Sequence, residues 1–283
     1  MNTWDIHALE GLLVESGRIA LRYYENPPTE YKRDRSPVTK ADREIEDLLG
    51  KSFDRPGEGS YLIGEETVEK RDGSYIDAAF KATSWVVDPI DGTALYANHL
   101  PCWGVSVGLM ERGLLTEGAI YFPLDDELFI TEGGAILQGR PGSLVRIEAT
   151  RRPYSLGGVI AITQEIARYE GIEVANPIYA GGSAVYPLTQ LLLGHFIAYV
   201  GQLNLWDVAG CLPLLRNAGF DLRLQEGPAV TGAVDAGAYI LSPGDAKRWK
   251  YRSNLICTGA PETLDRVMDG LRAAHARRKE AHG

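Results

Sequence analysis

The sequence predicts a protein of mixed α and β structure, because three hydrophobic patterns follow one another along its 283 residues. In residues 3–25 apolar side chains recur three and four positions apart, as in a helix with one buried face. Residues 103–137 contain apolar runs separated by short turn-like intervals, as in consecutive antiparallel strands. After residue 143, strand-like and helix-like segments alternate. This order indicates an N-terminal α+β half over residues 1–142 and a C-terminal α/β half over residues 143–283.

A charged loop follows the first helix, which ends before Pro27-Pro28. The loop spans residues 31–37, and a solvated surface loop is the simplest interpretation. Its basic side chains are an alternative contact for a phosphate group: Lys32, Arg33 and Arg35.

The second predicted helix begins near Thr39 and carries Asp42 in its first turn. A threonine followed three residues later by an acidic residue resembles a capping box, although glutamate or glutamine is the usual partner. An acidic residue at a helix N-terminus also suits a position that faces a metal site. The two interpretations are compatible.

The apolar run 61–64 predicts a short strand that ends at two glutamates, Glu65 and Glu66. Adjacent carboxylates are common on wet surfaces, but here an apolar strand carries them to an edge, which favours a ligand role. Side chains of neighbouring residues in an extended chain diverge, so we expect only one of the pair to bind a metal ion.

The stretch Trp85–Thr93 combines an apolar strand with the turn Asp-Pro-Ile-Asp-Gly-Thr. Pro89 lacks a backbone donor and is predicted to stop the strand, so that Asp88 and Asp91 leave its end three residues apart. Two like charges about 4 Å apart cost roughly 4 kcal/mol at an effective dielectric near 20, and a divalent cation would offset this. A capped turn without a metal is the alternative.

The remaining predicted elements follow in order, with residues 138–143 as the boundary between the halves. A glycine-rich segment, 181–184, enters one helix and can present N–H groups to an anion or a hydroxyl. Strands are predicted at 103–110, 114–122, 127–131, 135–137, 158–162, 176–179, 196–200, 220–224 and 238–241, and helices at 164–170, 184–193, 206–218 and 261–279.

The composition excludes several classes of protein. A net charge of −9 and a pI near 5.2 argue against a nucleic-acid-binding surface. Three widely spaced cysteines fit a reducing compartment better than a disulfide framework or a zinc site. The start of the chain lacks the pattern of a signal peptide, and no apolar run approaches the roughly 20 residues that cross a bilayer. We therefore expect a cytoplasmic protein that binds neither membrane nor nucleic acid.

Four acidic strings occur in a characteristic order: Pro37–Asp42, Ile63–Glu66, Trp85–Thr93 and Leu205–Gly210. Together they resemble the inositol monophosphatase family, within the wider fructose-1,6-bisphosphatase and bisphosphate-nucleotidase superfamily. The resemblance implies a layered α-β-α-β-α sandwich, a Mg²⁺-dependent phosphatase inhibited by Li⁺, and commonly a homodimer. A small phosphorylated metabolite is the implied partner.

The resemblance also implies the role of each acidic residue. Glu65, Asp88 and the carbonyl of Ile90 would hold a first Mg²⁺, and Asp88, Asp91 and Asp207 a second, with a third ion near Glu65 as an option. Gly92 and Thr93 would bind the phosphate. Thr93 with Asp42 would orient and deprotonate the attacking water, and Glu65 counts among the catalytic residues.

One departure from the family concerns the substrate. Inositol-specific members carry a glutamate shortly before the Trp-Asp pair, whereas residues 198–204 contain no acid here. Gln202 or Asn204 would make polar contacts instead, and Ser183 and Ala184 match the region that touches the sugar in relatives. The physiological substrate is therefore open among an inositol or sugar phosphate, a 3′(2′),5′-bisphosphate nucleotide and histidinol phosphate.

Two other classes of protein fit the sequence less well. In phosphatases of the haloacid-dehalogenase type the nucleophilic aspartate lies two residues before the second aspartate, whereas Asp88 and Asp91 are three apart. That class also leaves Glu65 and Asp207 unexplained. A regulatory scaffold without activity is the second alternative, and the intact ligand set argues against it.

Overall fold

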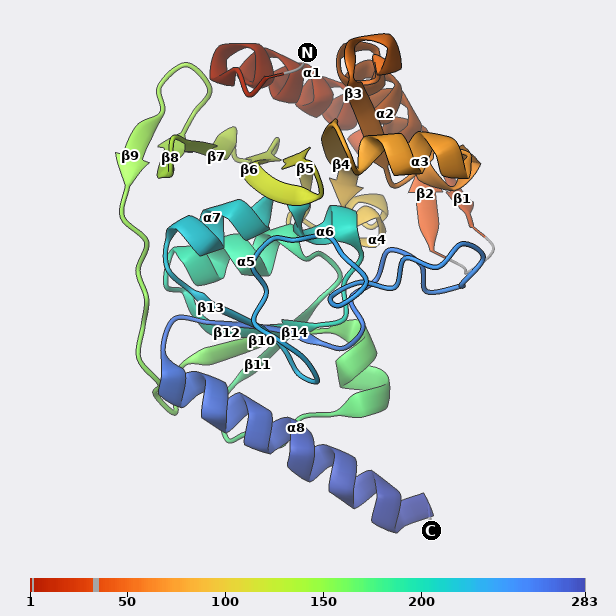
Figure 1. Cartoon of the computed structure of the whole chain (residues 1–283). Helices are drawn as coiled ribbons and strands as arrows, with labels where there is room; N and C mark the ends of the chain where they lie inside the picture. The colour runs from red at the N-terminus through yellow and green to blue at the C-terminus, as the bar shows by residue number, and fades with distance from the viewer. Residues whose placement is uncertain (2, 33–35, 283) are drawn as a thin grey trace.

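The computed structural model describes residues 1, 3–32 and 36–282, in which helices and two sheets form five layers (Figure 1). Helices cover the outer face of each sheet, and a third group of helices lies between the sheets. This arrangement confirms the predicted α-β-α-β-α sandwich. Arg33 and Arg35, which were considered as phosphate contacts, lie outside the described residues.

The first outer layer consists of α1 (Ile6–Tyr24) and α2 (Lys40–Phe53). Their apolar stripes pack on the first sheet, with Leu9 and Leu13 of α1 and Ile45 of α2 fully buried. The helical spacing of apolar residues therefore identified both helices correctly.

The first sheet has seven strands in sequential order from β3 to β9. The first two strands are parallel and all other neighbours are antiparallel, so most of the sheet is a meander. Its strands are β3 (Ser60–Gly64), β4 (Thr83–Asp91), β5 (Gly104–Glu111), β6 (Leu114–Phe122), β7 (Glu127–Glu132), β8 (Ala135–Gly139) and β9 (Val145–Ile147). Because β9 pairs with β8, this sheet extends a few residues past the predicted division at 142, which itself stays a prediction.

Pro89 does not stop β4, contrary to the sequence prediction. Pairing with β5 is interrupted after Asp88 and resumes at Asp91, which lies opposite Gly104. A bulge of this kind lets the strand bypass the missing N–H of proline and bends the chain. The two aspartates thus belong to one irregular strand rather than to a strand and a separate turn.

The middle layer and the second sheet belong to the C-terminal half. The middle helices are α5 (Val185–Leu192), α6 (Leu205–Ala209) and α7 (Cys211–Asn217). The second sheet is mixed, with strand order β11-β10-β12-β14-β13. Its strands are β10 (Val159–Thr163), β11 (Ile178–Gly181), β12 (Phe196–Gly201), β13 (Asp221–Leu224) and β14 (Leu255–Thr258).

One predicted strand of this half is wrong. The run 238–241 forms only an isolated bridge, in which Tyr239 pairs with Tyr251, and the last strand of the sheet is β14 instead. Both runs are short and apolar, and local pattern does not show which of them finds a partner in the sheet.

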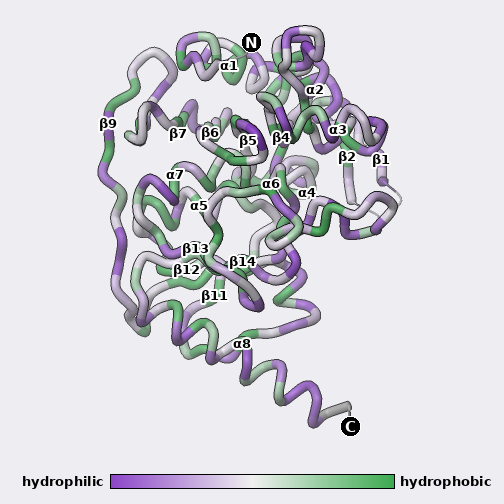
Figure 2. The backbone as a smooth tube through the Cα atoms, in the orientation of Figure 1, coloured by the Kyte–Doolittle hydropathy of each residue, from purple (hydrophilic) through white to green (hydrophobic). Residues whose placement is uncertain are grey.

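Helix α8 (Pro261–His282) covers the second sheet and ends the chain. Its inner residues Val267 and Leu271 are buried, whereas Figure 2 shows its outer end as mainly hydrophilic. None of the described helices has both the length and the apolar character needed to span a bilayer. The short elements are β1 (Thr29–Tyr31), β2 (Pro37–Thr39), η1 (Pro56–Glu58), η2 (Val68–Lys70), α3 (Gly73–Ala79), α4 (Thr93–Ala97) and η3 (Ile166–Glu170).

Candidate active site

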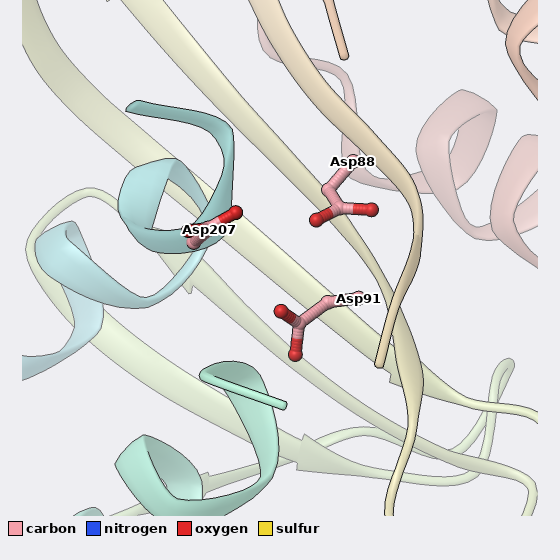
Figure 3. A group of neighbouring side chains, drawn as sticks. All are labelled: Asp88, Asp91 and Asp207. Carbon is pink, nitrogen blue, oxygen red and sulfur yellow. The ribbon is translucent and has the colours of Figure 1, made fainter. Parts of the chain in front are cut away.

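Three aspartates from both halves of the chain converge between the sheets. Asp88 and Asp91 come from β4 and Asp207 from α6, and their carboxylates point toward one another (Figure 3). One carboxylate oxygen of each lies within 4.8 Å of those of the other two. Asp88 and Asp91 are buried, and Asp207 is half-buried at the opening.

Asp91 also ties β4 to the start of α5. Its Oδ2 accepts the backbone N–H groups of Ala184 and Val185, each at 2.8 Å, and the hydroxyl of Ser183. Ser183 and Ala184 were predicted to touch the substrate. The structure shows them bonded to this carboxylate, and their contact with substrate stays a prediction.

Asp207 is held by the start of its own helix. Its Oδ2 accepts the backbone N–H of Asn204 at 2.8 Å and the side-chain amide of Asn204 at 3.2 Å. The helix approaches the first sheet closely, because a Cβ on Gly108 would lie 2.5 Å from the carbonyl oxygen of Ala209. A small residue at this contact therefore allows Asp207 to reach the aspartates of β4.

Asp42 and Thr93 form a second pair beside the aspartates. Thr39 caps α2 reciprocally with Asp42, as predicted, and Asp42 Oδ2 accepts the Thr39 N–H at 2.8 Å. The other oxygen, Oδ1, lies 3.1 Å from the Thr93 hydroxyl, which is also 3.0 Å from the carbonyl of Ile90. The capping interpretation of Asp42 is confirmed, and its functional role stays a prediction.

Glu65 follows β3 and lines the same pocket. Its carboxylate is 2.8 Å from the ammonium of Lys32, which also lies 2.7 Å from Glu66. Beneath this turn the buried Glu46 accepts the backbone N–H of Glu66 at 2.9 Å. Sequence reasoning missed Glu46, although its spacing of four residues from Asp42 places both on one face of α2.

The Gly92–Thr93 turn offers backbone N–H groups at the start of α4. Gly92 has φ +92°, a conformation that strains residues with a side chain, and a Cβ there would lie 3.0 Å from Ser183 Cβ. Only glycine allows this turn without strain and without displacing its neighbours.

The site is electrostatically unfavourable when its carboxylates are ionised. Burial, and then the charges of neighbouring carboxylates, raise the pKa of Asp88 and Asp207 well above the usual range. Burial raises the pKa of Asp91 to about 6, although three donors oppose the shift. Burial likewise raises the pKa of Asp42 to about 7, against the hydrogen bonds from Thr39.

The donor set fits a hard divalent cation. All the converging side-chain ligands are carboxylate oxygens, which Mg²⁺ prefers, and a positive ion would relieve their mutual repulsion. The pocket that they open into has a volume of about 330 Å³. Among the described residues that line it, Lys250 is the only lysine or arginine.

The pocket collects residues that sequence reasoning selected and others that it missed. Of the predicted site residues, Asp42 alone does not line it, and it accepts a hydrogen bond from Thr93, which does. The pocket also includes Thr163, Gln164, Glu165, Tyr199 and Lys250. These lie on several separate segments without a motif, so the sequence carried no signal for them. The predicted residues that line it are Glu65, Asp88, Ile90, Asp91, Gly92, Thr93, Ser183, Ala184, Gln202, Asn204 and Asp207.

Comparison with known proteins agrees with this geometry. The sequence pattern of the Inositol monophosphatase family matches residues 1–273. A histidinol-phosphatase of Chlorobaculum parvum is 28% identical over 245 residues, covering 78% of this chain and 87% of the relative. An inositol-1-monophosphatase of Mesorhizobium japonicum is 28% identical over 199 residues, covering 64% and 70%. A solved IMPase/NADP phosphatase complexed with Mg²⁺ and phosphate shares the fold, with a TM-score of 0.71, 14% identity and coverage of 93% and 92%.

The fold and the acidic site define a phosphoric monoester hydrolase. The chain belongs to the inositol monophosphatase family, as the resemblance of its acidic strings predicted.

Proposed function

We propose that this protein is a Mg²⁺-dependent phosphatase that hydrolyses a small phosphate monoester, of the inositol- or sugar-phosphate type, by direct attack of water. The convergence of Asp88, Asp91 and Asp207 within 4.8 Å is the observation that carries the proposal. When bound, Mg²⁺ supplies charge neutralisation, a lowered pKa of a coordinated water and a clamp on the phosphate oxygens.

The carboxylates have separate roles in this proposal. Glu65, Asp88 and the carbonyl of Ile90 would hold one ion, and Asp88, Asp91 and Asp207 would hold another. A third ion near Glu65 is part of the proposal, and its test is the stoichiometry of Mg²⁺ at saturation. The donors on Asp91 and Asp207 fix the direction of each carboxylate before an ion arrives.

Asp42 and Thr93 activate the attacking water. The Thr93 hydroxyl accepts a hydrogen bond from the water and passes its own proton toward Asp42 Oδ1, 3.1 Å away. A carboxyl group with a pKa of about 7 suits this general-base role near neutral pH. Gly92 and Thr93 bind the phosphate through backbone N–H groups at the start of α4.

The test is the release of inorganic phosphate from a panel of esters, with Mg²⁺ and with EDTA. The panel contains inositol phosphates, sugar phosphates, histidinol phosphate and adenosine 3′,5′-bisphosphate. We expect Mg²⁺-dependent release that Asp88→Asn abolishes. Unchanged release in Asp88→Asn would refute the mechanism, and the absence of release from every ester would support a non-catalytic scaffold.

Histidinol phosphate is the second candidate substrate. The similarity to the histidinol-phosphatase of Chlorobaculum parvum spans more of both chains than that to the inositol-1-monophosphatase of Mesorhizobium japonicum. A kcat/KM for histidinol phosphate well above that for inositol 1-phosphate would favour it.

Three further properties complete the proposal: inhibition by Li⁺, a homodimer and a cytoplasmic location. Each follows from the family or the composition, and each has a direct measurement. These are a Li⁺ titration of the activity, light scattering of the purified protein and fractionation of the source cell.

A further inference from the structure

Lys250 reaches the active-site pocket from a segment that no site motif contains. The segment 249–251 runs antiparallel to 203–205, just before the helix that carries Asp207. Leu205 N–H donates to the carbonyl of Trp249 at 2.9 Å, and Tyr251 N–H donates to the carbonyl of Leu203 at 2.9 Å. The backbone of Lys250 is therefore fixed beside Asn204, at the wall of the pocket.

Two buried aromatic residues hold Lys250 in place. Trp249 and Tyr251 are both fully buried, and Tyr251 stacks on Tyr239 with ring centres 4.2 Å apart. Trp249 stacks on Phe80 and donates its indole N–H to Glu69 at 3.1 Å. Lys250 lines the pocket, whereas the side chains on either side of it, Trp249 and Tyr251, are buried in the core.

Among the described residues, the ammonium of Lys250 makes one long ion pair, with Glu165, and its positive charge also acts on Asp207. Its Nζ lies 3.9 Å from Glu165 Oε2, and the two side chains are 30% and 47% exposed. A long and exposed ion pair of this kind contributes little to stability. An anionic ligand can therefore displace Glu165 at small cost.

The segment 202–204 beside Lys250 carries no negative charge. The neighbours Gln202 and Asn204 are uncharged, and the first is bonded through its amide to the carbonyl of Tyr251 at 2.8 Å. The reacting phosphate is assigned to Gly92 and Thr93. Lys250 is thus the one cationic side chain, among the described residues lining the pocket, that is left for the rest of the substrate.

We propose that Lys250 selects substrates whose organic part carries a second anionic group, a phosphate or a carboxylate, in addition to the phosphate that is cleaved. The inference rests on the proposed phosphatase function and narrows its substrate class. Lys250 binds the second anion through a charge-assisted hydrogen bond, and Glu165 turns to solvent.

Matched ester pairs that differ in the second anion provide the test. Adenosine 3′-monophosphate is compared with adenosine 3′,5′-bisphosphate, and glycerol 1-phosphate with 3-phosphoglycerate, which separates a second phosphate from a carboxylate. We expect the wild type to prefer the member with the second anion in at least one pair. We expect Lys250→Met to reduce that preference about 10- to 100-fold, and Lys250→Arg to restore part of it. Lys247→Met, which removes an exposed lysine of the same segment, serves as the control and should leave the preference unchanged.

A second measurement separates this inference from the proposed function. In the Asp42→Asn background with Mg²⁺, calorimetry measures binding of adenosine 3′,5′-bisphosphate and of adenosine 3′-monophosphate without relying on turnover. Tighter binding of the bisphosphate that Lys250→Met removes supports the inference even if no ester is hydrolysed. Equal loss for both ligands, no preference in the wild type, or no binding of either ligand would overturn it.

Discussion

Replacing Asp88 by asparagine is expected to stabilise the metal-free protein and to abolish its stabilisation by Mg²⁺. The asparagine side chain would keep an oxygen that accepts the Ile90 N–H, which lies 3.1 Å from Asp88 Oδ1. The substitution would remove the negative charge that lies between two other carboxylates. The variant therefore changes the charge of the site with little change in its shape.

The expected gain follows from the separation of the charges. Two like charges 4.8 Å apart repel by about 3.5 kcal/mol at an effective dielectric near 20, and Asp88 has two such neighbours. Solvent at the half-buried Asp207 screens part of this repulsion. A net gain of about 2–4 kcal/mol raises the melting temperature by roughly 5–10 °C in a protein of this size.

Thermal unfolding at pH 8, in EDTA and in Mg²⁺, measures both effects. The wild type should gain stability with Mg²⁺, whereas the variant should start higher in EDTA and respond weakly to the ion. Asp125→Asn is the control, since Asp125 is an exposed acid at a hairpin tip and its loss should change neither value by much. An Asp88→Asn protein that melts below the wild type in EDTA and retains the full Mg²⁺ response would refute the reasoning.

Three further predictions concern pH, catalysis and packing. The pKa of Asp91 is raised from 3.8 to about 6, so its ionisation destabilises the metal-free fold as the pH rises between these two values. Mg²⁺ should therefore raise the melting temperature more at pH 8 than at pH 5. An equal rise at both pH values would contradict this prediction. Asp42→Asn should lower kcat at least about 100-fold and change KM by no more than about threefold. The variant should also lose the rise of kcat with pH that the wild type shows near about pH 7. A large change in KM alone would instead indicate that Asp42 has a binding role. Gly64→Ala would place a Cβ 2.3 Å from the carboxyl group of Glu46. Urea unfolding should therefore show a free energy of unfolding lower by about 1–3 kcal/mol, and a Mg²⁺ titration should show weaker affinity. Wild-type values in both measurements would exclude the tight contact.

The sequence alone was sufficient to select the three aspartates that converge in the structure. Asp88 and Asp91 lie three apart on one strand, and Asp42 lies at a recognisable capping box, so local spacing determines much of their geometry. The layered fold was implied by the family resemblance, and the helical and strand periodicities along the chain agreed with it. Pro89 was misinterpreted, because a strand can continue past a proline at a bulge, where two of its residues lie opposite one residue of the partner strand.

Two residues of the pocket wall, Lys250 and Glu165, could not be predicted in this way. Lys250 and Glu165 belong to different segments and meet at 3.9 Å only after the second half of the chain has folded. The position of Lys250 depends on long-range packing, such as the stacking of its neighbour Trp249 on Phe80, and no local sequence pattern indicates such a contact.

The sequence by itself thus determined the class of enzyme, a phosphoric monoester hydrolase, because its acidic residues occur in compact strings that resemble those of the family. Only the tertiary structure decided that Asp207 reaches β4 through a small-residue contact. It also decided that a single lysine among the described pocket residues, held between two buried aromatic residues, lines the pocket. Such contacts join segments far apart in the chain, and their geometry is set by the packing of the layers rather than by any one stretch of residues.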